Sequence, residues 1–199
     1  LTTQLRDIAG SELNLQRKQR WLRHNARQAG EPMVLVEIGG LGASSELPVE
    51  PMLQCREPWA RDLERGFRSS IYSFQTVKDD WVIEPFIQTN WRVDKGDYGV
   101  QSKRHGGREG GHMGSYVWEP PLKNLQEDLK KLRPRTFSVD REGTLAWKQH
   151  LESILGDILP VRLRGSYWWT MGMTIVAIDL VGLEQLMFYM IDDPEGLHR

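Results

Sequence analysis

Three short, nearly continuous apolar segments constrain the fold of this chain more than any other feature of its sequence. They span residues 33–38, 80–87 and 158–163. Each is short and lacks the strict alternation of polar and apolar residues that marks a half-buried strand, so we expect strands that are buried on both faces. Stretches with helical periodicity separate the three runs. This order predicts an α/β protein with parallel strands.

Apolar spacing and end signals predict helices before, between and after these strands. They span residues 11–29, 59–77, 122–132, 140–155 and 171–190. The apolar face expected for the first helix consists of Leu13, Leu15, Trp21, Leu22 and Ala26. Gly30 and Gly156 follow two of the helices as stop signals, and Asp140 is the expected cap of the helix that ends at Leu155.

The region 88–120 interrupts this rhythm. Residues 92–100 alternate around a turn, which is typical of a hairpin, and a polar glycine-rich segment follows over 103–112. We expect this segment to be an exposed excursion and not part of the framework.

Composition excludes several classes of protein. Lys and Arg number 26 against 27 Asp and Glu, so no broad cationic field indicates a nucleic acid or an anionic membrane as a partner. Hydrophobic residues make up 39% and charged residues 27%, which excludes a membrane-embedded protein. Asp179 and Glu184 interrupt the most apolar stretch, so we expect a buried helix there. The single cysteine, Cys55, excludes an internal disulfide framework and predicts a reducing, cytoplasmic compartment.

The C-terminal residues carry a strong helix-start signal. Asp193 is an acidic cap, and Pro194 and Glu195 suit the first helical turn. Only a few residues follow before Arg199. Because helices shorter than about 12 residues are marginal alone, we expect either a continuation of the helix or a short terminal turn.

Two carboxylates are the principal catalytic candidates. Glu37 is near the end of the first predicted strand, and Glu84 lies within the second. Functional groups of parallel α/β folds gather at the carboxyl ends of the strands, and a carboxylate inside an apolar strand is costly to bury without a partner. The alternative to a functional role is a salt bridge to Arg162 or Arg164.

Three adjacent aromatic residues, Tyr167, Trp168 and Trp169, follow the third predicted strand. They are suited to line a pocket for a flat ligand, or alternatively to pack on the rim of the fold. His112 is a further candidate for substrate contact. His105 and His112 are seven residues apart, which is not a spacing with a metal-binding mechanism, so we expect no metal site there.

Several motifs follow one another in an order that resembles the uroporphyrinogen decarboxylase superfamily, and more narrowly the bacterial uroporphyrinogen-III-decarboxylase-like proteins. The resemblance runs from about residue 31 to residue 199. Its motifs are residues 54–58, 82–85, 120–123, 158–162, 164–165, 169–170, 182–187 and 192–198. It implies a (β/α)8 TIM barrel, of which residues 1–199 would be the N-terminal portion, as a single domain with an N-terminal helix in 1–30 and an excursion at 88–120. Because barrels of this type need about 250 residues, the missing C-terminal half would come from the same or a separate chain, and self-association is expected.

The superfamily contains two chemistries. Its decarboxylases carry an arginine-rich motif after the first strand to hold the carboxylates of a tetrapyrrole, whereas residues 37–42 here contain no arginine and one acid, Glu37. This replacement puts a negative charge where the decarboxylases have positive charges, which disfavours a substrate with many carboxylates. The resemblance therefore favours a corrinoid-dependent methyltransferase, with a corrinoid protein as partner. It implies zinc in the complete protein, to lower the pKa of a thiol acceptor, with ligands in the second half of the barrel and none expected among residues 1–199. A uroporphyrinogen decarboxylase is the alternative, and a non-catalytic barrel that binds a corrinoid or a partner is the second alternative.

Overall fold

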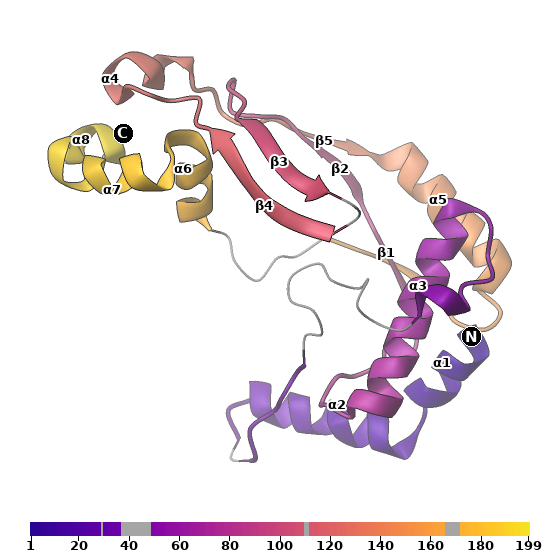
Figure 1. Cartoon of the computed structure of the whole chain (residues 1–199). Coiled ribbons are helices and arrows are strands. Elements are labelled where there is room, and N and C mark those ends of the chain that lie inside the picture. Colours follow the sequence, from indigo (N-terminus) through magenta and orange to yellow (C-terminus); the bar gives the residue numbers. More distant parts are fainter. Residues whose placement is uncertain (29, 37–48, 110–111, 166–171) are drawn as a thin grey trace. The chain divides into compact units, whose positions relative to one another are not determined.

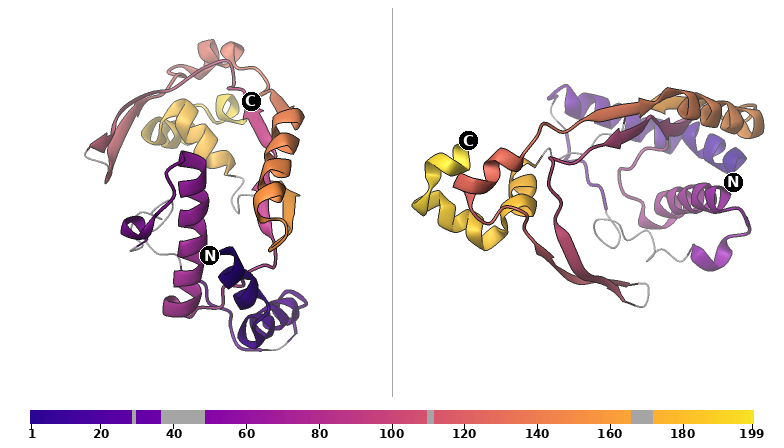
Figure 2. Two further views of the ribbon diagram at one scale, coloured as in Figure 1. Left: turned by 90° about the vertical axis from the view of Figure 1, so that its right-hand side faces the viewer. Right: turned by 90° about the horizontal axis from the view of Figure 1, so that it is seen from above.

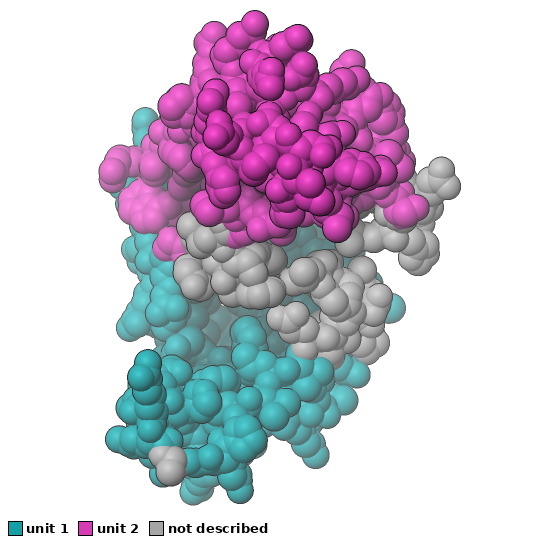
Figure 3. All heavy atoms as spheres, turned by 90° about the vertical axis from the view of Figure 1, so that its left-hand side faces the viewer, with its two compact units in different colours: residues 1–90, 142–164 teal, residues 91–141, 165–199 magenta. Residues whose placement is uncertain are grey.

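The computed structural model describes residues 1–28, 30–36, 49–109, 112–165 and 172–199. Its backbone contacts group the chain into two compact units, which Figure 3 distinguishes by colour. Unit 1 comprises residues 1–90 and 142–164, and unit 2 comprises residues 91–141 and 165–199. The chain thus leaves unit 1 after residue 90, returns to it at residue 142 for a helix and a strand, and leaves it again after residue 164.

Unit 1 contains most of the long helices. Its helical elements are α1 (Thr2–Ala9), α2 (Glu12–Asn25), a 3-10 turn at Glu50–Met52, α3 (Pro58–Tyr72) with a π-helical continuation at Ser73–Val77, and α5 (Arg141–Leu155). The Ser11 hydroxyl accepts a hydrogen bond from the Asn14 N–H and caps α2. The helices predicted over 11–29, 59–77 and 140–155 are therefore confirmed in position, with the first ending earlier than expected.

One parallel pair of strands joins the two parts of unit 1. β1 (Ile87–Asn90) pairs with β6 (Val161–Arg164), and Ile87 lies opposite Val161. Helix α5 precedes β6 and belongs to the connection between the two strands, as in a β-α-β crossover (Figure 1). The parallel α/β prediction is confirmed for this pair.

The core of unit 1 lies between this pair and helices α1, α3 and α5. Its fully buried members are Leu5, Ala9, Ile71, Ile83, Ile87, Leu151, Leu159 and Val161. At one side of the core, the rings of Trp59 on α3 and Trp147 on α5 meet edge to face, with their centroids 5.4 Å apart. These contacts fix α3 and α5 on the strand pair.

The predicted strands are displaced or absent in the described residues. Residues 33–36 have no regular structure and expose their apolar side chains, with Val34 56% exposed. Residues 80–86 are also irregular, and the strand predicted at 80–87 begins only at Ile87. Side chains supply hydrogen bonds to the backbone of both segments, and one backbone hydrogen bond joins the two, from the Asp80 N–H to the Val34 carbonyl at 2.9 Å. The expectation of buried strands is therefore wrong for residues 80–86 and for residues 33–36 of the first predicted strand, whose residues 37–38 lie outside the described part.

Unit 2 is built on two antiparallel ribbons. β2 (Arg92–Lys95) pairs with β5 (Phe137–Asp140), and β3 (Lys103–Glu109) pairs with β4 (His112–Glu119). The hairpin predicted within 92–100 is wrong, because β2 finds its partner about 40 residues further along the chain. The described residues of the glycine-rich segment, 103–109 and 112, are part of the β3–β4 ribbon, which can be followed in Figure 2.

A bulge explains how the glycine-rich segment fits a strand. The register of β3 against β4 shifts between Gly106 and Arg108. Gly106 and Gly107 have φ angles of 81° and 112°, which are strained for residues with a Cβ. The glycines that suggested a loop therefore permit an irregular ribbon.

Four helices complete unit 2. They are α4 (Leu125–Asp128), which continues as a 3-10 turn at Leu129–Lys131, α6 (Met173–Val181), α7 (Leu183–Asp192) and α8 (Pro194–His198). Leu122, Leu125 and Val181 form the small buried core. The short helix predicted at 122–132 is confirmed. So is the cap at Asp193, whose carboxylate accepts the Gly196 N–H at 2.9 Å.

The single buried helix predicted over 171–190 is wrong. Gly182, with a φ of 90°, separates α6 from α7, and several apolar side chains of these helices are exposed, among them Met173 and Ile191. No helix among the described residues has by itself the length and hydropathy needed to cross a membrane. Among the described residues, only α6 and α7 taken together have that length and hydropathy, and the two helices are bent by 97° relative to each other.

Candidate functional site

Helix α2 contacts residues 80–84 through polar side chains. Asn14, 1% exposed, pairs with both backbone groups of Ile83: its Oδ1 accepts the N–H at 2.9 Å, and its Nδ2 donates to the carbonyl at 2.9 Å. Arg17, also buried, donates to the carbonyl of Trp81 at 3.3 Å. The side chains of α2 thus take the place that a neighbouring strand would occupy, and buried backbone groups are satisfied.

The apolar face predicted for α2 is therefore wrong for all its members except Trp21, which is half-buried and whose Nε1 donates to the carbonyl of Asp80 at 2.8 Å. Leu13, Leu15 and Leu22 are exposed, and the residues that α2 buries are the polar Asn14 and Arg17. The backbone of residues 80–84 needs hydrogen-bonding partners, and apolar side chains cannot supply them. This need decides which face of the helix turns inward.

Two adjacent aspartates attach residues 34–36 to the same segment. Asp80 Oδ2 accepts the Val34 N–H at 2.8 Å, and Asp79 Oδ2 accepts the Val36 N–H at 3.0 Å. The Val34 carbonyl accepts the Asp80 N–H at 2.9 Å. Arg20 of α2 pairs with Asp80 at 2.8 Å and completes this network. The first two apolar runs of the sequence are therefore neighbours, as consecutive strands of a β/α fold would be.

Glu84 lies at the end of the segment that α2 holds. Its Oε2 is 2.9 Å from Nζ of Lys18, and the two side chains are 39% and 42% exposed. The arginines considered as its alternative partners lie elsewhere: the guanidinium groups of Arg162 and Arg164 are 4.6 and 5.0 Å from the centroid of the Phe86 ring. Glu84 is thus paired with a lysine of α2 and remains partly open to solvent.

A cavity of about 300 Å³ adjoins Glu84 within unit 1. Its wall combines aromatic and aliphatic side chains of α3 and of the segment 81–88, including Phe67, Trp81 and Phe86. A mostly apolar cavity with a carboxylate at its wall is the usual form of a small-molecule site. It is the candidate functional site of this unit.

The described residues do not show where the other predicted site residues lie relative to Glu84. Glu37, Tyr167, Trp168 and Trp169 lie outside the described residues. His112 begins β4 in unit 2, where its register partner is Glu109, and its side chain is also outside the described part. The catalytic and substrate-binding roles of these residues stay predictions.

The described residues do not fit a zinc ion. Within the described ranges no three His, Cys, Asp or Glu side chains are grouped as metal ligands. His105 Nε2 lies 3.0 Å from Glu119 Oε1, an exposed pair across the β3–β4 ribbon. No step of the chemistry is therefore assigned to a metal held by these residues.

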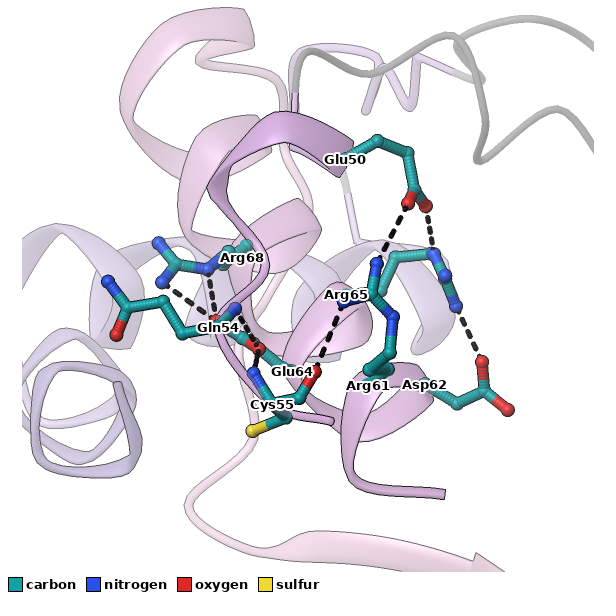
Figure 4. Close-up of polar contacts among 8 residues, drawn as sticks. All are labelled: Glu50, Gln54, Cys55, Arg61, Asp62, Glu64, Arg65 and Arg68. Carbon is teal, nitrogen blue, oxygen red and sulfur yellow. Dashed lines mark hydrogen bonds and ion pairs between the residues drawn. The ribbon is translucent and has the colours of Figure 1, made fainter. Parts of the chain in front are cut away.

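A buried carboxylate on α3 was not anticipated from the sequence. Glu64 is 5% exposed, and its Oε2 accepts the N–H groups of Gln54 and Cys55, both at 2.8 Å (Figure 4). Its Oε1 lies 2.8 Å from Nε and Nη2 of Arg68, one helical turn further on. The signal in the sequence is the Glu-to-Arg spacing of four residues on an amphipathic helix.

These contacts determine the protonation of Glu64 and of the nearby thiol. The Cys55 N–H, with Arg68 and the Gln54 N–H, lowers the pKa of Glu64 from 4.5 to about 2, despite its burial. The hydrogen bond to Glu64 is in turn the largest cause of a raised pKa of the Cys55 thiol. A thiol with a raised pKa is a poor nucleophile. The cluster therefore anchors the chain before α3 and does not activate Cys55.

Fold and cavity define the class of this chain as a mixed α/β protein with one parallel strand pair and an apolar cavity beside it. Comparison with protein families, with curated proteins and with solved structures finds no match to the chain.

Proposed function

We propose that the chain is the N-terminal portion of a uroporphyrinogen-decarboxylase-like (β/α)8 barrel. The observation that carries this proposal is the order of neighbours in unit 1. Residues 34–36 contact Asp79 and Asp80, and β1, which follows them, pairs in parallel with β6. Consecutive strands of a β/α barrel are neighbours in the same way. On this proposal residues 1–199 form a single partial-barrel domain in the cytoplasm.

The proposed activity is transfer of a methyl group from a corrinoid protein to a thiol or a related acceptor. The bond between cobalt and the methyl carbon breaks, and the acceptor sulfur forms a new bond to that carbon. Both electrons of the broken bond remain on cobalt, and the thiol proton passes to solvent. Glu84, at the wall of the cavity, would orient the acceptor, and Glu37, Tyr167, Trp168, Trp169 and His112 would complete the contacts with substrate.

The test is an anaerobic assay of the protein in its full natural length with methylcobalamin and a panel of thiols. We expect the spectrum of methylcobalamin to change to that of cob(I)alamin, with the methylated thiol formed in equal amount. Decarboxylation of uroporphyrinogen without methyl transfer overturns this proposal in favour of the first alternative. Saturable binding of methylcobalamin with neither reaction favours the non-catalytic barrel.

A pair of variants separates function from ion pairing at Glu84. Glu84→Gln and Lys18→Met each remove the same ion pair, but only the first removes the carboxylate. Because both side chains are about 40% exposed, we expect each variant to lose at most about 1 kcal/mol of unfolding free energy. Turnover should fall in Glu84→Gln alone. An equal loss of turnover in the two variants would show that Glu84 acts only through its ion pair with Lys18. Parent turnover in both would show that Glu84 has no role in the reaction.

A further inference from the structure

Unit 2 contains a cavity of about 310 Å³. Its wall is formed by residues 97–102, by Arg135 and by α6. One part of the wall is apolar, with Val100, Val176 and Leu180, and another is polar, with Gln101 and Ser102. The cavity therefore suits a small ligand that has an apolar body and a polar group.

Arg135 is the cation of this cavity. Its Cζ lies 4.3 Å from the centroid of the Tyr98 ring, so the guanidinium is held against an aromatic face. Its Nε is buried and has no hydrogen-bond partner among the described residues. A buried donor without a partner is uncommon in folded proteins, and the described part of the chain provides no acceptor for this one.

The acids that line the cavity are engaged elsewhere. Asp97 Oδ1 accepts the Gly99 N–H at 2.8 Å, and its Oδ2 accepts the side-chain N–H of Gln101 at 2.8 Å. Asp179 Oδ2 lies 3.9 Å from Nη2 of Arg104 on β3. The pKa of Asp97 is lowered chiefly by its hydrogen bonds to Gln101 and Gly99 and to a smaller degree by the charge of Arg135. Because no ion pair among the described residues joins either acid to Arg135, the stacked guanidinium retains its capacity to bind an external anion.

We propose that Arg135 and Tyr98 form a binding site for the carboxylate of a small organic acid, whose apolar body lies against Val100, Val176 and Leu180. A planar guanidinium matches a planar carboxylate with two parallel hydrogen bonds. The two aspartates in the wall repel a doubly charged phosphate more strongly than a singly charged carboxylate. We therefore expect the site to prefer a carboxylate to a phosphate. This site is independent of the function proposed for unit 1.

The test is a titration of the full chain with benzoate, followed through the 15N–1H resonance of Arg135 Nε. We expect a saturable shift of that resonance. The neutral analogue benzamide should produce no shift, and inorganic phosphate should bind more weakly than benzoate. Absence of a saturable shift with benzoate, or tighter binding of phosphate, overturns the proposal. This measurement needs no variant and so does not depend on the folding of one.

Two variants locate the site. Arg135→Lys keeps the charge and removes the planar fork, so benzoate affinity should fall about tenfold to a hundredfold, as expected for loss of a charge-assisted hydrogen bond. Arg133→Lys is the matched control, because Arg133 is exposed and does not line the cavity. It should bind benzoate as the parent chain does. An equal loss of affinity in both variants contradicts a site at Arg135.

Discussion

At the scale of single residues, Asn14 connects the N-terminal helices to the centre of unit 1. Its amide bonds both backbone groups of Ile83, and its Nδ2 also donates to the carbonyl of Ala9 at 3.0 Å. All three residues are buried. One side chain therefore satisfies three backbone groups that water cannot reach.

We expect Asn14→Ala to lower the free energy of unfolding by roughly 3 kcal/mol, because it leaves buried donors and acceptors without partners. Urea denaturation measures this loss. Asn25→Ala, at the exposed end of the same helix, is the control and should cost little. A loss below about 1 kcal/mol for Asn14→Ala is incompatible with the role assigned to this amide.

Glu64 predicts how unit 1 responds to acid. Its pKa is about 2 in the folded chain, against 4.5 for an ordinary glutamate. Between these values the unfolded chain binds a proton that the folded chain does not, so stability falls as the pH falls. The contribution of Glu64 is complete above about pH 4.5 and is lost as the pH approaches 2.

Thermal melts of the parent chain and of Glu64→Gln measure this contribution. We expect the variant to melt at a lower temperature at pH 7, and the difference between the two to shrink below pH 4.5. Asp62→Asn is the control, since Asp62 lies on the same helix and is largely exposed. A difference between parent and Glu64→Gln that does not change with pH excludes the assigned cause.

At the scale of elements, Gly182 decides that one apolar stretch becomes two helices. Its φ of 90° is unfavourable for residues with a side chain, and a Cβ built there would lie 2.9 Å from Cγ of Pro120. The break between α6 and α7 therefore favours glycine at this position, because Pro120 leaves no room for a Cβ.

We expect Gly182→Ala to destabilise the chain by about 1–3 kcal/mol, because alanine is strained in this conformation. Gly66→Ala is the matched control: Gly66 lies in the middle of α3, and no atom is within 4 Å of a Cβ built there. That variant should gain up to about 1 kcal/mol, from the higher helix propensity of alanine. Guanidinium denaturation compares the two, and a stabilised Gly182→Ala would show that the break is not required.

At the scale of the whole molecule, unpaired strand edges and exposed apolar side chains predict self-association. All three sheets among the described residues have two strands, so each strand has only one partner. Such pairs are marginal in water and offer open edges to other chains. The exposed apolar residues include Val34, Val117, Phe137, Met173 and Ile191.

We expect the full chain to form oligomers in sedimentation velocity experiments, or to bind the dye ANS strongly. The reason is that exposed strand edges and apolar side chains are more stable when another chain or an apolar ligand buries them. In the partial-barrel proposal the remaining half of the barrel, from the same or another chain, buries these surfaces. A dispersed monomer of 23.0 kDa that melts cooperatively and does not bind the dye contradicts both this prediction and the partial barrel.

The sequence determined the features that depend on neighbours along the chain. Helices α3 and α5 lie near their predicted limits, counting the π-helical turn after α3, whereas α2 begins as predicted but ends at Asn25 and not at residue 29. Such limits can be predicted because apolar spacing, caps and stop residues act within a turn or two. Asp193 caps α8 as predicted, for the same reason. Glu84 could be singled out as a carboxylate in an apolar run, but its pairing with Lys18, 66 residues away, could not.

Only the tertiary structure decided which groups satisfy the backbone and which faces are buried. Residues 80–84 look like a strand in the sequence, yet Asn14 and Arg17 supply their hydrogen bonds, which turns the polar face of α2 inward. β2 pairs with β5 and not within a hairpin. The pattern of residues along a segment indicates how apolar the segment is, but not which groups will bond its backbone. The choice of hydrogen-bond partner is made in three dimensions, because unsatisfied buried backbone groups cost more than exposed leucines.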